Sequence, residues 1–233
     1  MAASSYDRET IASPNPLVRF SHTARHSRSE RMIAALLPDG GSYLDYGSGN
    51  GELLSRLSRS APNIQLFGLE PFMKSRVDTG ELPYTLFTAL DDVGDQKFDV
   101  ISAFEVLEHL NDENFAIFCA AAERLLKPGG ALVISVPIMQ GPVLIPKYLN
   151  ARFVKRSSWR YSISELVKAS VFLGEVPRGA TGAHYETHKG FSWRKLRTAL
   201  SAKFDLAAEE FSPAPKLWWG FNSQWFATFR RKH

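Results

Sequence analysis

Three glycines at every second position follow an acidic residue, and this spacing suits a nucleoside ligand that also carries a positive charge. The stretch reads Asp45-Tyr46-Gly47-Ser48-Gly49-Asn50-Gly51, between an apolar segment and a leucine-rich helical pattern. Glycine lets the backbone turn sharply from strand to helix and lets a ligand touch the main chain. The Asp45 carboxylate adds a negative charge beside that contact. This charge disfavours the pyrophosphate of a dinucleotide, which binds to free backbone amides at a helix N-terminus.

A dinucleotide-binding fingerprint requires the spacing G-x-G-x-x-G, and this loop departs from it. Counting from Gly47, the position of the third glycine is occupied by Glu52. Glu70 ends the next apolar segment, where a carboxylate can accept hydrogen bonds from both hydroxyls of a ribose. The alternative is that Glu70 only ends a strand at the surface. The loop and Glu70 together indicate a nucleoside site that is not built for a nicotinamide dinucleotide.

Two further motifs make the pattern more specific. The glycine loop itself, with the pattern Asp-x-Gly-x-Gly-x-Gly, resembles the first motif of class I S-adenosylmethionine (SAM) methyltransferases. Residues 105–110, Glu-Val-Leu-Glu-His-Leu, follow an apolar strand and resemble the fourth-strand motif of the ubiquinone-biosynthesis O-methyltransferase-like group. Residues 126–132, Leu-Lys-Pro-Gly-Gly-Ala-Leu, resemble the turn before the fifth strand of the same superfamily. The motifs occur in the order of that superfamily over residues 43–137, and outside this region the sequence is less diagnostic.

The resemblance implies a cofactor, SAM, and the residues that would hold it. Asp45 and the glycine loop would hold the methionine part, and Glu70 would hold the ribose. Asp91 or Asp92 would lie beside the adenine, while Phe72 would pack on the adenosine or belong to the core. Phe104 and Glu105 would line the methionine end of the pocket. The expected cofactor-binding residues are Asp45, Gly47, Ser48, Gly49, Gly51, Glu70, Phe72, Asp91, Phe104 and Glu105.

Methyl transfer is an in-line displacement, so the protein must chiefly align the acceptor atom with the methyl group. An oxygen acceptor also needs its proton removed, usually by His, Asp or Glu. His109 is the first candidate base because it follows the fourth strand, although it could instead brace the loop by bonding to the backbone. His184 and His188 form a second pair, which would reach the site if their segment folds over it.

The spacing of His184 and His188 also raises the question of a metal ion. Histidines at i and i+4 can ligate zinc on one face of a helix, with Glu186 as a third ligand. However, Gly182 and Gly190 flank the pair, the segment has a loop-like composition, and no cysteine cluster completes a site. We therefore expect no metal ion.

The composition is that of a globular protein with one α/β domain and an elaboration. The chain has 233 residues, with 44% hydrophobic and 22% charged residues, as in ordinary globular proteins. Its one cysteine, Cys119, excludes an internal disulfide framework and is expected to be a small buried residue. No signal-peptide pattern and no run of 18 apolar residues are present, so we expect a cytoplasmic protein.

The net charge of +4 is unevenly distributed. No acid occurs between Glu123 and Glu165, whereas lysines, arginines and aromatic residues alternate there. This interval could face an anionic substrate, a membrane surface or nucleic acid, or it could be a solvated face. We retain peripheral contact with the inner membrane face through residues 147–161 as a hypothesis. Nucleic acid is not favoured, because no Asn/Asp-Pro-Pro-Tyr motif follows the fourth strand.

Apolar strands alternate with helical patterns, which is typical of a parallel sheet covered on both faces. We therefore expect an α/β, Rossmann-like seven-stranded sheet that is mostly parallel, with an antiparallel last strand and helices on both faces. Strands are expected at residues 42–46, 64–69, 84–87, 98–103, 131–137, 204–211 and 224–230. Helices are expected at residues 17–37, 52–57, 111–126, 164–173 and 192–200.

Four regions follow from this pattern. Residues 1–40 would form an arm and a helix that caps the cofactor, and residues 41–137 the SAM-binding core. Residues 138–190 would be an insertion that shapes the acceptor site, and residues 191–233 would complete the sheet. The aromatic cluster at residues 218–226 would pack an edge hairpin, or else serve as a substrate platform or dimer contact.

The favoured function is SAM-dependent methyl transfer to a small-molecule or glycan acceptor, with oxygen as the favoured acceptor atom. The choice of oxygen rests on the resemblance around His109. The alternatives are an N- or C-methyltransferase, an RNA or protein methyltransferase, or a catalytically silent partner protein with this fold. A dehydrogenase is disfavoured by Glu52 at the third glycine position. The sequence leaves the oligomeric state open.

Overall fold

The computed structural model describes residues 27–71, 82–154, 161–172, 176–178, 185 and 187–232. Three residues named from the sequence, Phe72, His184 and Glu186, lie outside these ranges, as do residues 1–26 of the expected capping arm. Part of the basic interval, residues 155–160, also lies outside them.

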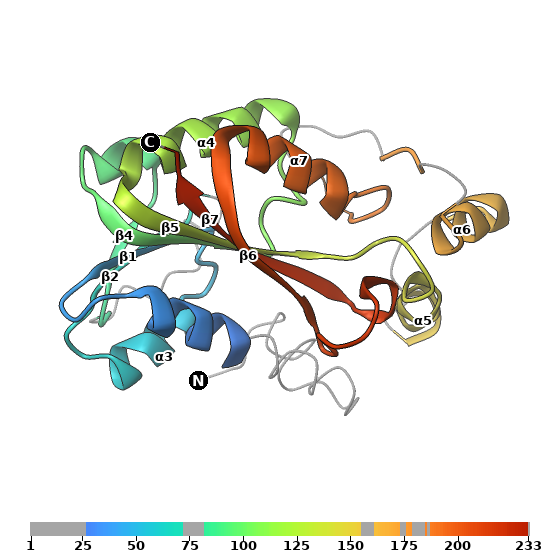
Figure 1. Ribbon diagram of the computed structural model, residues 1–233, viewed down its shortest axis with the longest axis horizontal. Helices are drawn as coiled ribbons and strands as arrows, with labels where there is room; N and C mark the ends of the chain where they lie inside the picture. The colour runs from blue at the N-terminus through green and yellow to red at the C-terminus, as the bar shows by residue number, and fades with distance from the viewer. Residues whose placement is uncertain are drawn as a thin grey trace.

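A seven-stranded sheet with the order β3-β2-β1-β4-β5-β7-β6 forms the centre of the molecule (Figure 1). Neighbouring strands from β3 to β5 pair in parallel, while β7 runs antiparallel to both β5 and β6. This arrangement confirms the expected mostly parallel sheet with an antiparallel last strand. The strands are β1 (Ser42–Tyr46), β2 (Gln65–Leu69), β3 (Thr85–Phe87), β4 (Phe98–Phe104), β5 (Leu126–Pro137), β6 (Phe204–Ser212) and β7 (Gln224–Arg231).

Alternate residues of each central strand face opposite sides of the sheet, and each side has its own hydrophobic core. In β1, Leu44 packs in the core beneath α4 and α7, whereas Tyr43 packs in the core beneath α3 and the helix at 27–36. Ile101 and Val100 of β4 alternate in the same way. Figure 1 shows these helices on opposite faces of the sheet, as the sequence pattern predicts.

The helices that cover the sheet begin at residues suited to that position. Asn111 accepts a hydrogen bond from the Asn114 amide, and Ser192 accepts one from the Lys195 amide, so each caps the first turn of its helix. Cys119 of α4 is fully buried, as expected for a small core residue. The covering helices are α3 (Glu52–Ser60), α4 (Asp112–Leu125) and α7 (Trp193–Lys203).

Between β5 and α7 the chain forms an additional helical region at one end of the sheet (Figure 1). It contains α5 (Leu144–Leu149), a π-helical segment η2 (Asn150–Val154) and α6 (Ile163–Ser170). Ser162 and Glu165 form a capping box at the start of α6, which satisfies two backbone donors at once. Short 3-10 segments occur at η1 (Leu90–Val93), after β3, and at η3 (Trp219–Phe221), before β7.

One boundary differs from the sequence prediction. Residues 127–130 were expected as a turn, but β5 already begins at Leu126, which pairs with Phe98. The register then shifts between Phe98 and Val100, so that Val100 pairs with Ala131. The lysine, proline and two glycines therefore form an irregular, bulged start of the strand, in which Gly129 has a φ of +73°. Bulges of this kind insert residues into one strand without ending its pairing.

The strand order places β1 between β2 and β4. From β1 the chain continues to β2 and β3 on one side, and it then crosses to β4 and β5 on the other side, so the strand order reverses between β1 and β4. Ligands of open α/β sheets bind outside the carboxyl ends of the strands at such a point. The glycine loop, Glu70 and residues 105–109 follow the carboxyl ends of β1, β2 and β4, respectively. Among the described residues, no helix combines the length and apolar composition needed to cross a bilayer.

Candidate functional site

The glycine loop is fixed to the end of the neighbouring strand by backbone hydrogen bonds. The amides of Gly47 and Ser48 both donate to the carbonyl of Leu69, at 2.8 and 3.2 Å. The Gly51 amide then donates to the Ser48 carbonyl at 2.9 Å, and α3 starts at the next residue. The loop therefore has a defined shape before any ligand arrives.

All three glycines have positive φ angles, but their surroundings differ. A Cβ at Gly47 would lie 2.5 Å from Val106 Cγ2, and one at Gly51 would overlap the hydroxyl of Tyr84. A Cβ at Gly49, by contrast, would meet no described atom within 4 Å. Gly47 and Gly51 are thus required by packing, whereas Gly49 borders open space that a ligand could fill.

Asp45 is a buried carboxyl group at the end of β1, 5% exposed. The Ser102 hydroxyl donates to Asp45 Oδ1 at 2.6 Å, and Tyr43 shares a 2.6 Å hydrogen bond with the same serine. The pKa of Asp45 is raised to about 6, and burial is the largest cause. The hydrogen bonds from Ser102 and Tyr43 act in the opposite direction, and the charge of Glu70 adds to the rise. A cationic group of a ligand placed here would favour the ionised carboxylate.

Glu70 follows β2 directly and is also buried, at 6% exposed. Its Oε2 accepts a hydrogen bond from the Gly49 amide at 2.8 Å. The carboxylate is thereby directed across the loop rather than into solvent, so the alternative of a simple surface strand end is wrong. The two buried acids lie on either side of the glycine loop.

The end of β4 contacts the same loop. Glu105 has a φ of +57°, a left-handed conformation that costs a non-glycine residue roughly 1–2 kcal/mol. Its amide donates to the Ser135 carbonyl at 2.9 Å, and Ser135 Oγ donates to Glu105 Oε1 at 3.3 Å. Val106 then packs against Gly47. Phe104 is half-buried, with its ring 6.4 Å from that of Phe226.

The expected adenine contact lies beyond β3. Asp91 is exposed on η1, while Asp92 Oδ2 accepts a hydrogen bond from the Ala89 amide at 3.1 Å and so caps that turn. Because the Asp92 carboxylate serves the backbone, Asp91 is the better candidate of the two for a ligand.

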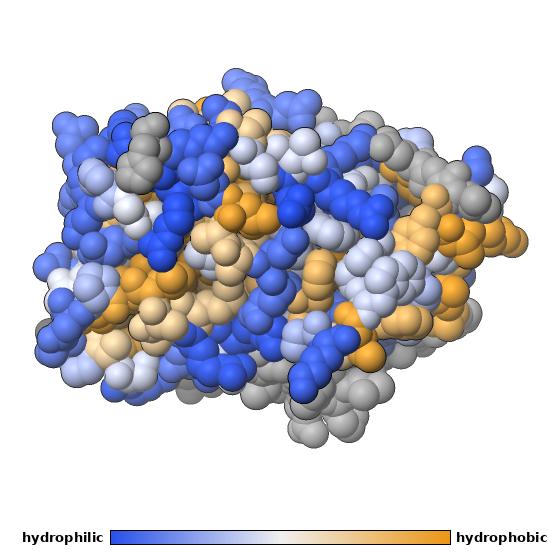
Figure 2. All heavy atoms as spheres, in the orientation of Figure 1, coloured by the Kyte–Doolittle hydropathy of each residue, from blue (hydrophilic) through white to orange (hydrophobic). Residues whose placement is uncertain are grey.

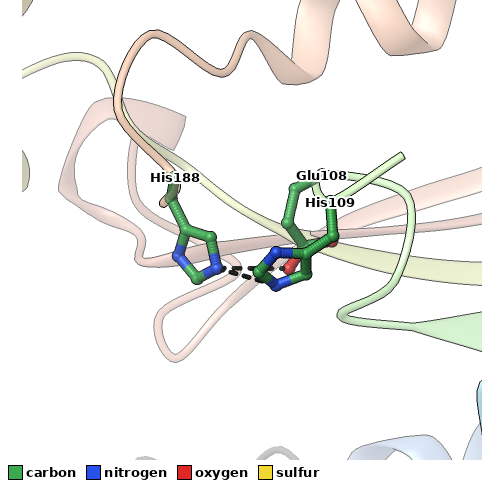
Figure 3. Close-up of side chains that lie close together, drawn as sticks. All are labelled: Glu108, His109 and His188. Atoms are coloured by element: carbon green, nitrogen blue, oxygen red, sulfur yellow. Dashed lines mark hydrogen bonds and ion pairs between the residues drawn. The ribbon is translucent and has the colours of Figure 1, made fainter. Parts of the chain in front are cut away.

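Figure 3 shows Glu108, His109 and His188 directed toward one another. His109 Nε2 lies 3.1 Å from His188 Nε2, and His188 Nε2 lies 3.8 Å from Glu108 Oε1. Glu108 is fully buried, and both histidines are partly buried. The chain therefore brings His188 to His109 across 79 positions of sequence.

The backbone around this cluster determines which nitrogen of His109 carries a proton. His109 Nδ1 lies 2.7 Å from the carbonyl oxygen of Tyr185, and a carbonyl can only accept, so Nδ1 must be the protonated nitrogen. In the neutral ring, Nε2 then presents its lone pair to His188. The Tyr185 amide also donates to the His109 carbonyl at 2.6 Å. His109 thus braces the loop and also directs a basic nitrogen into the cluster.

The same three side chains form a possible set of metal ligands. One donor atom from each of Glu108, His109 and His188 lies within 4.8 Å of the other two. Two imidazoles and one carboxylate suit zinc and several first-row transition metals, and a histidine whose other nitrogen donates to a carbonyl is oriented as metal ligands usually are. The expectation of no metal ion weighed His188 together with His184 and Glu186 and not with Glu108 and His109, so this donor set was missed.

A cavity of about 440 Å³ lies beside Tyr185 and Arg178, which hydrogen-bond to His109 and to the Glu108 carbonyl, respectively. It is lined by residues of the loop after β4, by α7 and by the segment before it, among them Leu107, Tyr185 and Phe191. The Arg178 guanidinium lies over the Tyr185 ring at 3.5 Å and donates to the Glu108 carbonyl. Burial lowers the pKa of Arg178. Volumes of this order are typical of small-molecule sites.

Four residues of the site were not assigned roles from the sequence: Ser102, Tyr84, Val106 and Glu108. Ser102 is a fully buried polar residue in an apolar strand, opposite Asp45 in the register, which was a usable signal. Glu108 stood in the quoted motif without a role. Tyr84 and Val106 carry no sequence signal, because only the folded loop shows that they face the glycines.

Comparisons with known proteins show which proteins the chain resembles. A family model described as a methyltransferase domain matches residues 20–172, which is well over half of the chain. The ubiquinone biosynthesis O-methyltransferase of Xanthomonas axonopodis pv. citri is 30% identical over 122 residues, covering 49% of this chain and 50% of that protein. The protein of the same description from Klebsiella pneumoniae is 26% identical over 147 residues, covering 59% and 60%.

The chain thus spans only about half to three fifths of these curated relatives. Among solved structures, the N-methyltransferase NodS of Bradyrhizobium japonicum with S-adenosylhomocysteine is similar at a TM-score of 0.55 and 14% identity, covering 95% of this chain and 90% of that chain. Magnesium protoporphyrin IX methyltransferase of Synechocystis, also with S-adenosylhomocysteine, has a TM-score of 0.56 and 14% identity, covering 94% and 89%. At such identities the likeness concerns the fold.

Proposed function

The chain belongs to the class I SAM-dependent methyltransferases, with SAM as its cofactor, and from this premise we propose that it methylates an oxygen atom of a small-molecule or glycan acceptor. The observation that carries the choice of oxygen is the cluster of Glu108, His109 and His188. An oxygen acceptor must lose its proton as the methyl group arrives, and a basic nitrogen beside the methyl group serves this need.

We assign the cofactor to the crevice at the ends of β1 and β2. Asp45 would face the positive end of the methionine part, and Glu70 would accept hydrogen bonds from the ribose hydroxyls. The open space beside Gly49 would be filled by the cofactor. Asp91 would lie toward the adenine, with Phe104 and Glu105 at the methionine end.

The contact between Val106 and Gly47 connects the cofactor loop to the histidine cluster. His109 comes three residues after Val106, so an acceptor beside the methyl group would also lie near the cluster. His109 Nε2 would take the acceptor proton, and His188, held near the Glu108 carboxylate, would share it.

Two distant relatives carry the description O-methyltransferase, which agrees with transfer to oxygen. The competing functions are transfer to nitrogen or carbon, methylation of RNA or protein, and a silent partner role. The buried acids of the crevice, Asp45 and Glu70, argue against a silent role, since two buried carboxylates are costly without a ligand to face.

The test is methyl transfer from tritiated SAM to phenols, catechols and sugars, each paired with its amine analogue. We expect labelled methyl ethers from hydroxylated acceptors and little product from the amines. His109→Gln should reduce the turnover number by roughly 10²- to 10⁴-fold while leaving SAM affinity unchanged. Tyr185→Phe keeps the backbone carbonyl that orients His109 and should behave as the parent protein.

Product on the amines alone would replace oxygen by nitrogen as the acceptor atom. SAM binding without transfer to any acceptor or cell extract would favour the silent partner. The cluster is tested separately by chelation and by added zinc or magnesium. If a chelator abolishes transfer and the metal restores it, a cation held by Glu108, His109 and His188 activates the acceptor. If chelation has no effect, the histidines act as bases on their own.

A further inference from the structure

The exposed large apolar side chains gather at one end of the molecule. Of the eleven that the structure describes, nine lie on α5, on α6 and the turn after it, and on the loop that contains η3. We call the exposed apolar side chains of these three segments the end surface. Figure 2 shows apolar residues gathered at the end where Figure 1 places α5 and α6.

The apolar stripe of α6 faces outward. Ile163 is 84% exposed, and Val167 and Val171 are 51% and 52% exposed. These residues are spaced by four, so they lie on one face of the helix, while Ala169 and Ser170 are buried on the other. A surface helix normally turns its apolar stripe inward, whereas within the described part of the chain the stripe of α6 stays exposed. An isoleucine at 84% exposure protrudes rather than lining a groove.

The three segments form one continuous surface. The Phe172 ring after α6 lies 5.5 Å from Trp218 and 5.0 Å from Trp219. The Gly141 amide before α5 donates to the Ala169 carbonyl at 2.8 Å, and the Val143 amide donates to the Gly220 carbonyl at 3.2 Å. From the η3 loop, Leu217, Trp218 and Phe221 add side chains that are 57%, 49% and 58% exposed.

The charge around this surface is positive. Residues 141–154, 161–172 and 213–223 contain one acid, Glu165, and that acid is bound by Lys189 at 2.9 Å and by the Ser162 amide at 2.8 Å. Lys147 turns inward, donating to the carbonyls of Ile138 and Ser223. The exposed bases of these ranges are Arg152 on η2, Lys168 on α6 and Lys216 in the η3 loop.

We propose that the end surface docks the protein on a bilayer that contains anionic phospholipids. The apolar side chains of α6 and the η3 loop enter the region of the headgroups and upper acyl chains, and Arg152, Lys168 and Lys216 approach the phosphates. Tryptophan favours this boundary because its ring is apolar and its N–H is polar. The lack of unpaired acids on the three segments fits a negatively charged lipid surface better than a protein partner of mixed charge.

The experiment is co-sedimentation of the full chain with vesicles of phosphatidylcholine, with and without phosphatidylglycerol. We expect binding to the anionic vesicles that weakens with added salt. A triple variant, Ile163→Ser, Val167→Ser and Phe221→Ser, should lose about tenfold or more of the affinity, because three large apolar side chains no longer enter the lipid. Ile117→Ser is the matched control: Ile117 is 46% exposed on α4, away from the end surface, and its variant should bind as the parent does.

Unchanged affinity for SAM shows that the variants fold, and the vesicle assay needs no methyl acceptor, so its outcome is independent of the proposed reaction. The proposal is overturned if the parent protein binds neither kind of vesicle, or if the triple variant binds as strongly as the parent. It is also overturned if the parent forms a dimer that the triple variant cannot form while neither binds vesicles. The end surface would then be a contact between two copies of the chain.

Discussion

At the scale of single residues, the site depends on acids that the fold removes from water. Asp45 keeps its hydrogen bond with Ser102 but loses most of its hydration, and its pKa rises to about 6 for that reason. Glu70 is oriented by one backbone amide of the glycine loop. Each acid is expensive to bury alone, and each becomes favourable when a cationic, hydroxyl-rich ligand occupies the crevice.

Asp45 should make the stability of the protein depend on pH in a defined direction. Because its folded pKa is raised from 3.8 to about 6, its contribution is fully present below about pH 3.8 and is lost as pH rises through about 6. The whole effect amounts to roughly 3 kcal/mol, at 1.4 kcal/mol per pH unit. Asp45→Asn should remove this decline, as measured by urea unfolding between pH 4 and 7.

Asp99→Asn serves as a control, because the pKa of Asp99 is shifted in the opposite direction to that of Asp45. Burial raises the pKa of Asp99, but the bonds from Lys127 and Ser42 outweigh it, so the net shift is downward. Its contribution is therefore present above its unfolded pKa and is lost only as pH falls through the lowered folded value. If the free energy of unfolding changes with pH in the same way for Asp45→Asn and for the parent protein across pH 4–7, the assigned burial of Asp45 is wrong.

The protonation of Asp45 should also govern cofactor binding. Only the ionised carboxylate attracts a cationic group, so the affinity for SAM should fall about tenfold for each pH unit below about 6. Isothermal titration calorimetry at several pH values measures this slope. The Asn variant should bind more weakly and show no such slope, and an equally steep slope in it would assign the pH dependence to another group.

At the scale of elements, strand ends and the loops after them build the site. The glycine loop hydrogen-bonds to β2, and Val106 after β4 packs on it. These contacts hold three strand ends at one crevice. The strained φ of Glu105 occurs at this junction, where backbone strain is often retained for function.

The three glycines should respond differently to alanine. Gly49→Ala should cost only roughly 1–2 kcal/mol, from its φ of +56°, because no described atom would contact the new Cβ. It should nevertheless weaken SAM binding strongly, since the methyl group enters the ligand space. Gly51→Ala should destabilise the fold more, because its Cβ would overlap Tyr84. Thermal unfolding and SAM titration of both variants separate these effects.

The result that would contradict this account is a Gly49→Ala protein that binds SAM as well as the parent. An unfolding temperature of Gly51→Ala equal to that of the parent would also contradict it, because Tyr84 would then have moved aside with no loss of stability. The first outcome would remove the glycine loop from the cofactor crevice, and the second would show that packing against Tyr84 does not require Gly51.

At the scale of the whole molecule, the reversal of strand order between β1 and β4 is the feature on which we base the position of the ligand. Helices seal both faces of the sheet, so the carboxyl edge is the exposed part that can be shaped by loops. The helical region after β5 lies beyond this edge, and the segment that follows α6 carries His188 back to His109. Residues 138–190 therefore remain our candidate for the part that shapes the acceptor site.

Cofactor binding at this edge should stabilise the entire fold. S-adenosylhomocysteine at about 100 times its dissociation constant should raise the free energy of unfolding by about 2.7 kcal/mol. NADH at the same concentration should leave it unchanged, since Glu52 stands where a dinucleotide loop needs its third glycine. Denaturant unfolding with each ligand tests this, and stabilisation by NADH alone would return the dehydrogenase to consideration.

The sequence alone determined the order of the strands along the chain, and it identified the acids and glycines that the fold brings together after β1 and β2. These features are local. The side chains of a strand alternate between its two faces with a period of two residues, and a sharp turn from strand to helix is indicated by glycines. The expected strand at residues 42–46 and the adjoining glycine loop match the structure for this reason. The bulged start of β5 was missed, because register depends on the neighbouring strand.

Only the tertiary structure decided which distant side chains meet. Glu108 and His109 reach His188 across about a third of the chain, and the end surface joins three segments whose apolar residues look like ordinary core positions in the sequence. A periodic pattern shows that a helix has an apolar face, but not whether another element covers it. Such contacts arise from packing between elements, and packing is set by the whole fold rather than by neighbours in sequence.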